Sequence, residues 1–209
     1  MKTIYLIRHS IKEKKQNNNT VDKQKLNEEI KLSEEGKALA YELAHMDYLK
    51  NVKEVWASNY ERAKETARIL FDDKTINVSD SFDERHYGDF DKDTIKDEFW
   101  IEQFKSPDLK NNNGESQKDV RKRFDDKINE ILEKSPNDEI AIVCHNACIL
   151  FYLLKYCDLV NAEIPRKLTI SYKGKVLIKD SIMKAPSIMK LKFDGKDILD
   201  IEYIEMSSK

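Results

Sequence analysis

The fold is decided by the stretch Lys2-Thr3-Ile4-Tyr5-Leu6-Ile7-Arg8-His9-Ser10 near the start of the chain. Its apolar part, residues 4–7, mixes β-branched, aromatic and aliphatic side chains, which is typical of a strand buried on both faces of a parallel sheet. An arginine and a histidine follow directly, and the carboxyl ends of such strands carry the ligand sites of α/β sheets. We interpret this junction as the beginning of an active site, although a charged pair in an ordinary first loop has the same pattern.

A second apolar strand ends in the same way. Residues 139–144, Glu-Ile-Ala-Ile-Val-Cys, lead into His145-Asn146, and the apolar residues that follow have helical spacing. Because the carboxyl ends of parallel strands meet at one edge of a sheet, we expect His9 and His145 to lie together. This coincidence is the main indication of a functional site.

The remaining pattern predicts an α/β fold in one domain, residues 1–209, with a doubly wound, mostly parallel sheet flanked by helices. Further strands are expected at 53–57 and 75–78, and helices after Ser33, over 58–70 and after Ser116. The segment 166–204 alternates in strand fashion around Asp194-Gly195, which predicts a C-terminal β-hairpin with a structural role.

Two other side chains are candidates for the same site. Arg62 falls near the start of a predicted helix, where unpaired backbone N–H groups favour an anion. Glu84 lies in a loop dense in titratable groups, and a carboxyl group in a pocket can act as a general acid. A histidine that attacks phosphorus needs cations around the oxygens and an acid for the departing alkoxide, and these residues can fill each role.

We expect two segments to select the substrate, although their sequences show no pattern that identifies it. The polar stretch from Ile11 to Ile30 has little apolar periodicity and is interpreted as a long loop, either a substrate-contacting flap or a disordered insertion. Residues 93–104 are interpreted as an inserted helix that packs on the core or covers the pocket.

Composition limits the possible partners and locations. The 209 residues include 37 basic and 39 acidic side chains, well mixed and giving a net charge of -2, so no basic field favours nucleic acid. Three cysteines do not suggest a disulfide framework and favour a reducing compartment. With no signal peptide or membrane-spanning stretch predicted, we expect no membrane association and a cytoplasmic location.

Several short motifs occur in a fixed order along the chain. They are Arg8-His9-Ser10, Leu32-Ser33-Glu34-Glu35-Gly36, Ser58 with Arg62, Ala63, Thr66 and Ala67, Glu84 with Gly88, Gly114-Glu115-Ser116, and His145. Taken together they resemble the histidine phosphatase superfamily, which includes the cofactor-dependent phosphoglycerate mutases. The resemblance implies a phosphoglycerate mutase-like fold and an enzyme that hydrolyses a small phosphorylated metabolite.

The resemblance also implies roles for individual residues. His9 would be the nucleophile that becomes phosphohistidine, and Arg8, Arg62 and His145 would hold the phosphoryl oxygens. Glu84 would protonate the leaving group and then activate water. No metal or other cofactor is required, because arginines and histidines supply the positive charge that other phosphoryl-transfer sites take from a cation.

Two positions depart from the family pattern. Ser10 replaces the usual glycine of the opening motif, and Asn146 replaces a glycine that commonly follows the second histidine. Both are possible substrate contacts that can narrow the pocket. The contacts typical of the mutases are not recognisable in residues 11–15, which favours a phosphatase over a mutase.

Other classes of protein fit less well. A cysteine phosphatase needs an arginine six positions after its cysteine. The residue six positions after Cys144 is Leu150, so this chain does not have that motif. His45 and His86 are interpreted as a helix-end and a loop residue, because the histidines lack the spacing of a metal site. A mutase and a non-catalytic module that binds phosphorylated ligands remain alternatives, and the oligomeric state stays open.

Overall fold

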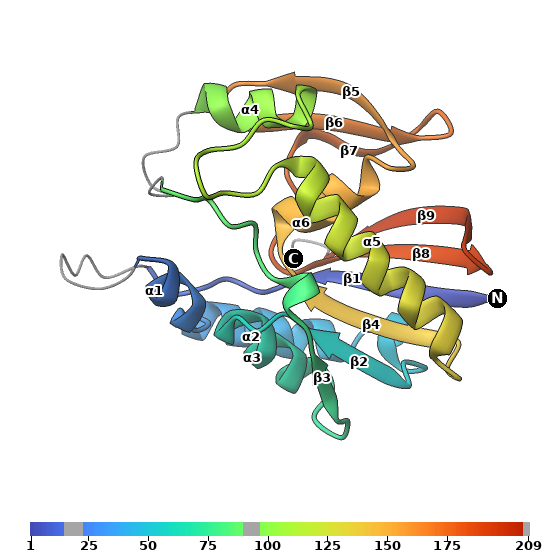
Figure 1. The fold of residues 1–209 in the computed structure, drawn as a ribbon. Helices are drawn as coiled ribbons and strands as arrows, with labels where there is room; N and C mark the ends of the chain where they lie inside the picture. The colour runs from blue at the N-terminus through green and yellow to red at the C-terminus, as the bar shows by residue number, and fades with distance from the viewer. Residues whose placement is uncertain (15–22, 90–96, 207–209) are drawn as a thin grey trace.

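The computed structural model describes residues 1–14, 23–89 and 97–206 and has a mixed α/β architecture (Figure 1). Its main sheet has six strands in the order β3-β2-β4-β1-β8-β9. The strands are β1 (Lys2–Arg8), β2 (Glu54–Ala57), β3 (Ile76–Val78), β4 (Glu139–Cys144), β8 (Ser187–Asp194) and β9 (Asp197–Glu205). The first four strands of this order are parallel, and β8 and β9 form an antiparallel hairpin beside β1. The predicted fold class is confirmed, including its C-terminal hairpin.

The central position of β1 explains its continuous apolar run. The strand pairs with β4 on one side and β8 on the other, so both of its faces are covered. Ile4 and Leu6 belong to the core on one face of the sheet, whereas Tyr5 and Ile7 belong to the core on the opposite face. A strand that buries alternate residues in two different cores has no polar face, as the sequence predicts.

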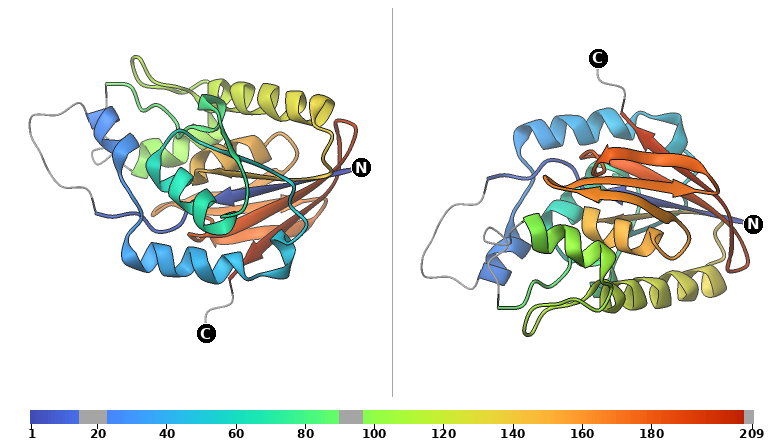
Figure 2. Two further views of the ribbon diagram at one scale, coloured as in Figure 1. Left: turned by 90° about the horizontal axis from the view of Figure 1, so that it is seen from below. Right: turned by 90° about the horizontal axis from the view of Figure 1, so that it is seen from above.

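Helices cover both faces of the main sheet. On one face lie α2 (Glu34–Ala44) and α3 (Glu61–Leu70), and on the other lie α5 (Gln117–Lys134) and α6 (Asn146–Leu153). Figure 2 shows α2 and α5 on opposite sides of the strands. Two predicted helix starts are confirmed: the Ser33 hydroxyl accepts a hydrogen bond from the Gly36 amide, and Ser116 forms a capping box with Asp119. The helix expected over 58–70 begins at Glu61.

A second, antiparallel sheet lies in the upper part of Figure 1, above α6 (Asn146–Leu153) and the β8–β9 hairpin. Its strands are β5 (Asp158–Glu163), β6 (Lys167–Tyr172) and β7 (Lys175–Ser181), in that order. Helix α4 (Asp97–Lys105) packs beside β5. The alternation in the sequence predicted β6 and β7 but not β5, whose only buried side chain is that of Ala162.

The segment from Ile11 to Ile30 is only partly the loop that the sequence predicts. Residues 15–22 lie outside the described part of the chain, but Lys23–Glu29 form a helix, α1. This helix presents a single large apolar side chain, Leu26, so its sequence gives no periodic signal. It is held instead by polar contacts: Arg62 donates a hydrogen bond to the Asn27 carbonyl oxygen, and Gln24 donates one to the Tyr60 hydroxyl.

The inserted helix expected over residues 93–104 is observed as α4, which begins at Asp97, while residues 90–96 lie outside the described part. Trp100, Ile101 and Phe104 are buried in the core, and Trp100 also reaches the pocket described below. The helix therefore does both things that the sequence allowed: it packs on the core and covers the pocket.

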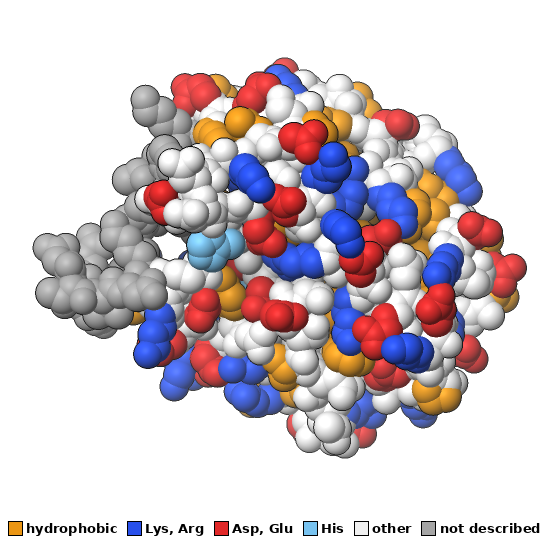
Figure 3. Space-filling view, viewed as in Figure 1, with side chains coloured by type: hydrophobic (Ala, Val, Ile, Leu, Met, Phe, Trp, Pro, Cys, Tyr) orange, Lys and Arg blue, Asp and Glu red, His pale blue; other side chains and the backbone are white. Residues whose placement is uncertain are grey.

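The surface has no large field of one charge on the face seen in Figure 1. Figure 3 shows acidic and basic side chains interspersed over this face, in keeping with the balanced composition. Among the helices in the described residues, none has the length and apolar character that crossing a membrane would require.

Candidate active site

Three neighbouring strands deliver the central groups of the site. In the sheet order β2-β4-β1, each strand ends at the same edge, and Ser58, His145 and His9 follow directly. The Ser58 amide donates a hydrogen bond to the carbonyl oxygen of Val143, and the His9 amide donates one to that of Cys144. The two histidine rings come to lie with their centroids 5.1 Å apart, so the convergence expected from the sequence is observed.

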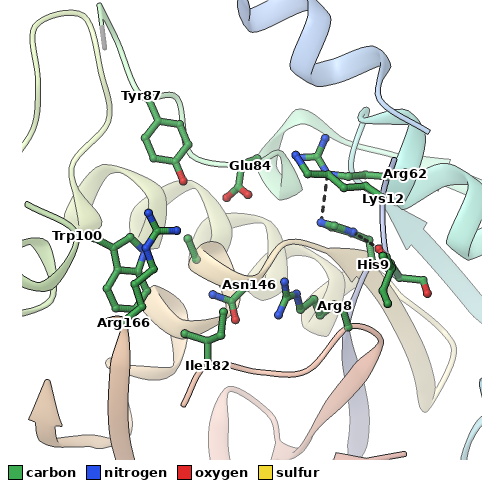
Figure 4. A pocket seen from close by; sticks show the side chains of 14 residues that line it. Arg8, His9, Lys12, Arg62, Glu84, Tyr87, Trp100, Asn146, Arg166 and Ile182 are labelled. Atoms are coloured by element: carbon green, nitrogen blue, oxygen red, sulfur yellow. Dashed lines mark hydrogen bonds between the residues drawn. The ribbon is translucent and has the colours of Figure 1, made fainter. Parts of the chain in front are cut away.

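The hydrogen bonds of His9 define its tautomer. Nδ1 lies 2.7 Å from the carbonyl oxygen of Ser10, to which it can only donate. Nε2 lies 3.1 Å from Nε of Arg62, which is always a donor. Nδ1 therefore carries the proton, and Nε2 has a lone pair that accepts the hydrogen bond from Arg62, drawn as a dashed line in Figure 4.

The surroundings of His9 keep it neutral. Burial lowers the pKa of His9 well below its usual value of 6.5, and the nearby Arg62, His145 and Arg8 lower it further. A neutral imidazole with an unprotonated Nε2 is a nucleophile, whereas an imidazolium is not.

Two arginines bring positive charge to the pocket. Arg62, the second residue of α3, is fully buried, and its Nη1 donates to the Asn27 carbonyl oxygen over 2.6 Å. Arg8 ends β1 and donates from Nη1 to the carbonyl oxygen of Met183. Nη2 of Arg62 and Nε of Arg8 are buried and have no hydrogen-bond partner among the described residues. These N–H groups are available for an anion, because a buried N–H group without a partner lowers the stability of the folded protein.

His145 is held by a chain of hydrogen bonds that leads to Asp83. Nε2 of His145 lies 2.8 Å from the Ser58 hydroxyl, which lies 2.8 Å from Oδ1 of Asp83. Because the hydroxyl has one proton and Asp83 can accept it, Ser58 accepts a hydrogen bond from Nε2 of His145. Burial raises the pKa of Asp83, and hydrogen bonds from Asn59 and Ser58 oppose that rise. This chain directs Nδ1 of His145 toward Oε2 of Glu84, 4.0 Å away.

Glu84 is buried in the loop that follows Phe82, facing the pocket. Its Oε1 accepts a hydrogen bond from the Arg85 amide over 3.2 Å and lies 3.9 Å from Sγ of Cys148. Gly88 in the same loop has a φ of 70° and approaches the Asn112 carbonyl so closely that a Cβ atom would lie 2.0 Å from it. Only glycine fits this position, which explains its place in the motif.

The loop of residues 83–88, which carries Glu84 and is called the acid loop below, is supported by the turn around Glu115. This turn does not line the pocket around His9. The Glu115 carboxylate accepts hydrogen bonds from the His86 amide and from Arg123, and Arg123 also donates to the carbonyl oxygens of Ser81 and Asp83. Sequence reasoning missed Arg123, because an arginine on a helix of mixed charge gives no distinguishing signal.

The two positions that depart from the family pattern have different surroundings. Ser10 lines the pocket, but its hydroxyl donates to the Gly36 carbonyl oxygen over 2.6 Å and so points toward the start of α2. Gly36 is required there, because a Cβ atom would lie 1.9 Å from the carbonyl oxygen of Ile11. Asn146 lines the pocket, and its buried Oδ1 has no hydrogen-bond partner among the described residues.

The pocket has a volume of about 320 Å³ and lies between the carboxyl edge of the main sheet and the second sheet. Figure 4 shows His9 and Arg62 at one end, with Trp100 and Arg166 at the other. Arg166, Ile182 and Ala185 come from the segment that the sequence marked as structural. His45 and His86 do not line this pocket. His45 is exposed at the end of α2, as predicted.

A sheet edge that gathers two histidines, two arginines and a carboxyl group is suited to hold a phosphoryl group. The sequence comparison agrees with this class of site: the model of the histidine phosphatase superfamily (branch 1) matches residues 4–175. The chain belongs to this superfamily.

Solved structures support the same fold. A mycobacterial glucosyl-3-phosphoglycerate phosphatase with inorganic phosphate has a TM-score of 0.69 and 17% identity, covering 100% of this chain and 98% of its own. A putative α-ribazole-5'-P phosphatase from Escherichia coli has a TM-score of 0.66 and 15% identity, and the match covers 98% of this chain and 96% of the phosphatase. A phosphoserine phosphatase from Entamoeba histolytica has a TM-score of 0.62 and 17% identity, with 97% of each chain covered. No curated protein sequence matches the chain.

The lowered pKa of His9 predicts a loss of stability in acid. In the unfolded chain His9 binds a proton below about pH 6.5, whereas in the folded chain it stays neutral to lower pH. The unfolded state then binds more protons, so the free energy of unfolding falls as the pH falls below about 6.5, by at most about 1.4 kcal/mol per pH unit. Urea unfolding between about pH 7 and pH 5 should therefore show a steeper loss for the wild type than for His9→Gln.

His45→Gln is the matched control for this measurement, because it removes an exposed histidine outside the pocket. We expect its pH dependence to parallel that of the wild type. Equal pH dependence of the wild type and His9→Gln would contradict a buried, neutral His9.

Proposed function

We propose that this protein is a phosphomonoesterase that transfers the phosphoryl group of a small phosphorylated metabolite first to His9 and then to water. The observation that carries the proposal is the state of His9: its Nε2 has a lone pair and faces Nε of Arg62 within a cationic pocket. Membership of the histidine phosphatase superfamily supports it. The similar mycobacterial and amoebic structures are named as phosphatases, one with inorganic phosphate and a mutant of the other with phosphoserine.

In the first half-reaction, Nε2 of His9 attacks phosphorus while the bond to the leaving oxygen breaks. Arg8 and Arg62 hold the other phosphoryl oxygens through their N–H groups, which stabilise the negative charge as it shifts. His145 joins them when Nδ1 carries a proton in addition to the Nε2 proton that it donates to Ser58. Glu84 gives its proton to the leaving oxygen, so that an alcohol departs instead of an alkoxide. Within the described residues, the available N–H groups of Arg8 and Arg62 fit this task.

In the second half-reaction, water attacks the phosphohistidine. Glu84, now a carboxylate, accepts a proton from the water, and the bond between phosphorus and Nε2 breaks. Inorganic phosphate leaves and the neutral His9 is restored, with its Nδ1 proton still donated to the Ser10 carbonyl oxygen. The arginines supply the positive charge throughout, so this mechanism has no step that uses a metal ion.

The first test removes the nucleophile. We expect His9→Ala to lower the hydrolysis of 4-nitrophenyl phosphate by more than about a thousandfold, because no other group replaces the attacking nitrogen. The His45→Ala variant provides a matched control, and circular dichroism checks the folding of both. Turnover unchanged in a folded His9→Ala variant would contradict the mechanism.

The same assay separates the two alternatives from the proposal. A binding module would retain phosphate affinity but show no turnover in the wild type. A mutase would transfer the phosphoryl group between phosphoglycerates faster than it releases phosphate.

The second test concerns the acid. Because 4-nitrophenolate departs readily without a proton and an alkoxide does not, Glu84→Gln should lower kcat/KM for an alkyl phosphate more than for 4-nitrophenyl phosphate. A positioned general acid contributes about a hundredfold or more, which sets the size of the expected difference. The parameter kcat/KM is the one to compare, because it reports the steps up to cleavage of the ester. Glu42→Gln, on the exposed side of α2, provides the control. An equal loss on both substrates would show that Glu84 does not protonate the leaving group.

A further inference from the structure

The pocket extends well past the phosphoryl-binding groups. Figure 4 shows Tyr87, Trp100, Arg166 and Ile182 at the end away from His9, with Glu84 on the wall between the two ends. These four side chains come from the acid loop, α4, the turn between β5 and β6, and the segment after β7. The far end is therefore built by four separate elements.

The direction of the reaction decides what occupies this end. In a phosphoryl transfer the attacking and leaving groups lie on opposite sides of phosphorus. With His9 as the attacking group, the leaving group must point away from it, past Glu84. The organic part of the substrate then contacts Tyr87, Trp100 and Arg166.

Arg166 can bind an anion in this position. Its Nε donates to Oδ1 of Asp97 over 3.1 Å, and its guanidinium carbon lies 5.8 Å from the centre of the Trp100 ring. No other described residue accepts a hydrogen bond from this guanidinium. Both Arg166 and Asp97 are partly exposed, with side-chain exposures of 45% and 37%, so their ion pair is weak and leaves the two Nη groups for a ligand.

Tyr87 lines the same end of the pocket and is neutral (Figure 4). Burial raises the pKa of Tyr87 well above its usual value, and the nearby Glu84 raises it further, whereas Arg85 and Arg166 oppose the rise. The phenol therefore keeps its proton.

The two ends of the pocket differ in the anion that they favour. Near His9, the positive charges of Arg8 and Arg62 match a phosphate dianion. At the far end, Arg166 has only a weak ion pair with the partly exposed Asp97. Its guanidinium therefore favours a further negative charge on the substrate.

We propose that the far end of the pocket is a subsite for a carboxylate on the leaving group, bound by Arg166 with Tyr87 and Trp100 beside it. The inference rests on the proposed function for the direction of the leaving group. It defines the substrate class as small phosphomonoesters that carry a carboxylate at the end opposite the phosphate.

The test compares two aryl phosphates that differ only in charge, 4-carboxyphenyl phosphate and 4-carbamoylphenyl phosphate. We expect the wild type to have the higher kcat/KM for the carboxylate. Arg166→Asn should reduce this preference about tenfold or more, the size expected for a hydrogen bond to a charged group. Asparagine is chosen because Arg166 has a φ of 50°, which asparagine tolerates better than most residues.

Two further variants control the experiment. Arg166→Lys keeps the charge and should retain part of the preference. Lys167→Gln removes the neighbouring, exposed charge, which lies outside the pocket lining, and should leave the preference unchanged. If Lys167→Gln lost the preference for the carboxylate as Arg166→Asn does, general surface charge would explain the preference. That result would overturn the subsite.

Binding of the non-hydrolysable 4-carboxybenzylphosphonate and 4-carbamoylbenzylphosphonate, measured by calorimetry, separates the two proposals. A tighter Kd for the carboxylate that depends on Arg166, without hydrolysis of either ester, would support the subsite and refute the phosphatase. Hydrolysis of both esters with no preference, equally affected by Arg166→Asn, would refute the subsite and leave the phosphatase standing.

Discussion

The hydrogen bond between Nε of Arg62 and Nε2 of His9 is the contact on which the rest of the site depends. It joins the start of α3 to the end of β1, and through Nη1 of Arg62 it also joins both to α1. Because an arginine Nε–H can only donate, the contact leaves His9 with its proton on Nδ1 and its lone pair on Nε2. Burial lowers the pKa of His9 most, and the same guanidinium lowers it further, so Arg62 helps to fix both the tautomer and the charge of the proposed nucleophile.

Two buried N–H groups of this site would be satisfied by a bound anion. Nη2 of Arg62 and Nε of Arg8 are buried without a partner among the described residues, and such a donor costs about 1–3 kcal/mol. The sheet holds the residues around these donors in place. His9, Ser58 and His145 each follow directly after a strand that is paired with its neighbours in a fixed register. A bound phosphoryl group would satisfy the arginines, and its phosphorus atom would replace the Nε–H group of Arg62 as the partner of the His9 lone pair.

The sequence predicted those parts of the structure whose signals are local. The apolar runs of β1 and β4 and the caps at Ser33 and Ser116 require only neighbouring residues, and the main sheet follows from them. Helix α1 and strand β5 escaped prediction because each buries little apolar surface of its own and is positioned by contacts with distant residues. For the same reason Arg166 could not be found: it follows a proline in a turn, and only the packing of the second sheet beside α4 brings it to the pocket. Ser10 stands where a narrower pocket was expected; it lines the pocket, and its hydroxyl bonds to Gly36.

The central claim, that Nε2 of His9 receives the phosphoryl group, is tested most directly by locating the phosphate on the protein during turnover. Rapid quenching in alkali, followed by mass spectrometry and ³¹P NMR, identifies both the residue and the ring nitrogen that carries the phosphate. The hydrogen bonds of His9 predict an acid-labile phosphohistidine at His9, phosphorylated on Nε2. Phosphate on Nδ1 of His9, or on any other residue, would contradict the account.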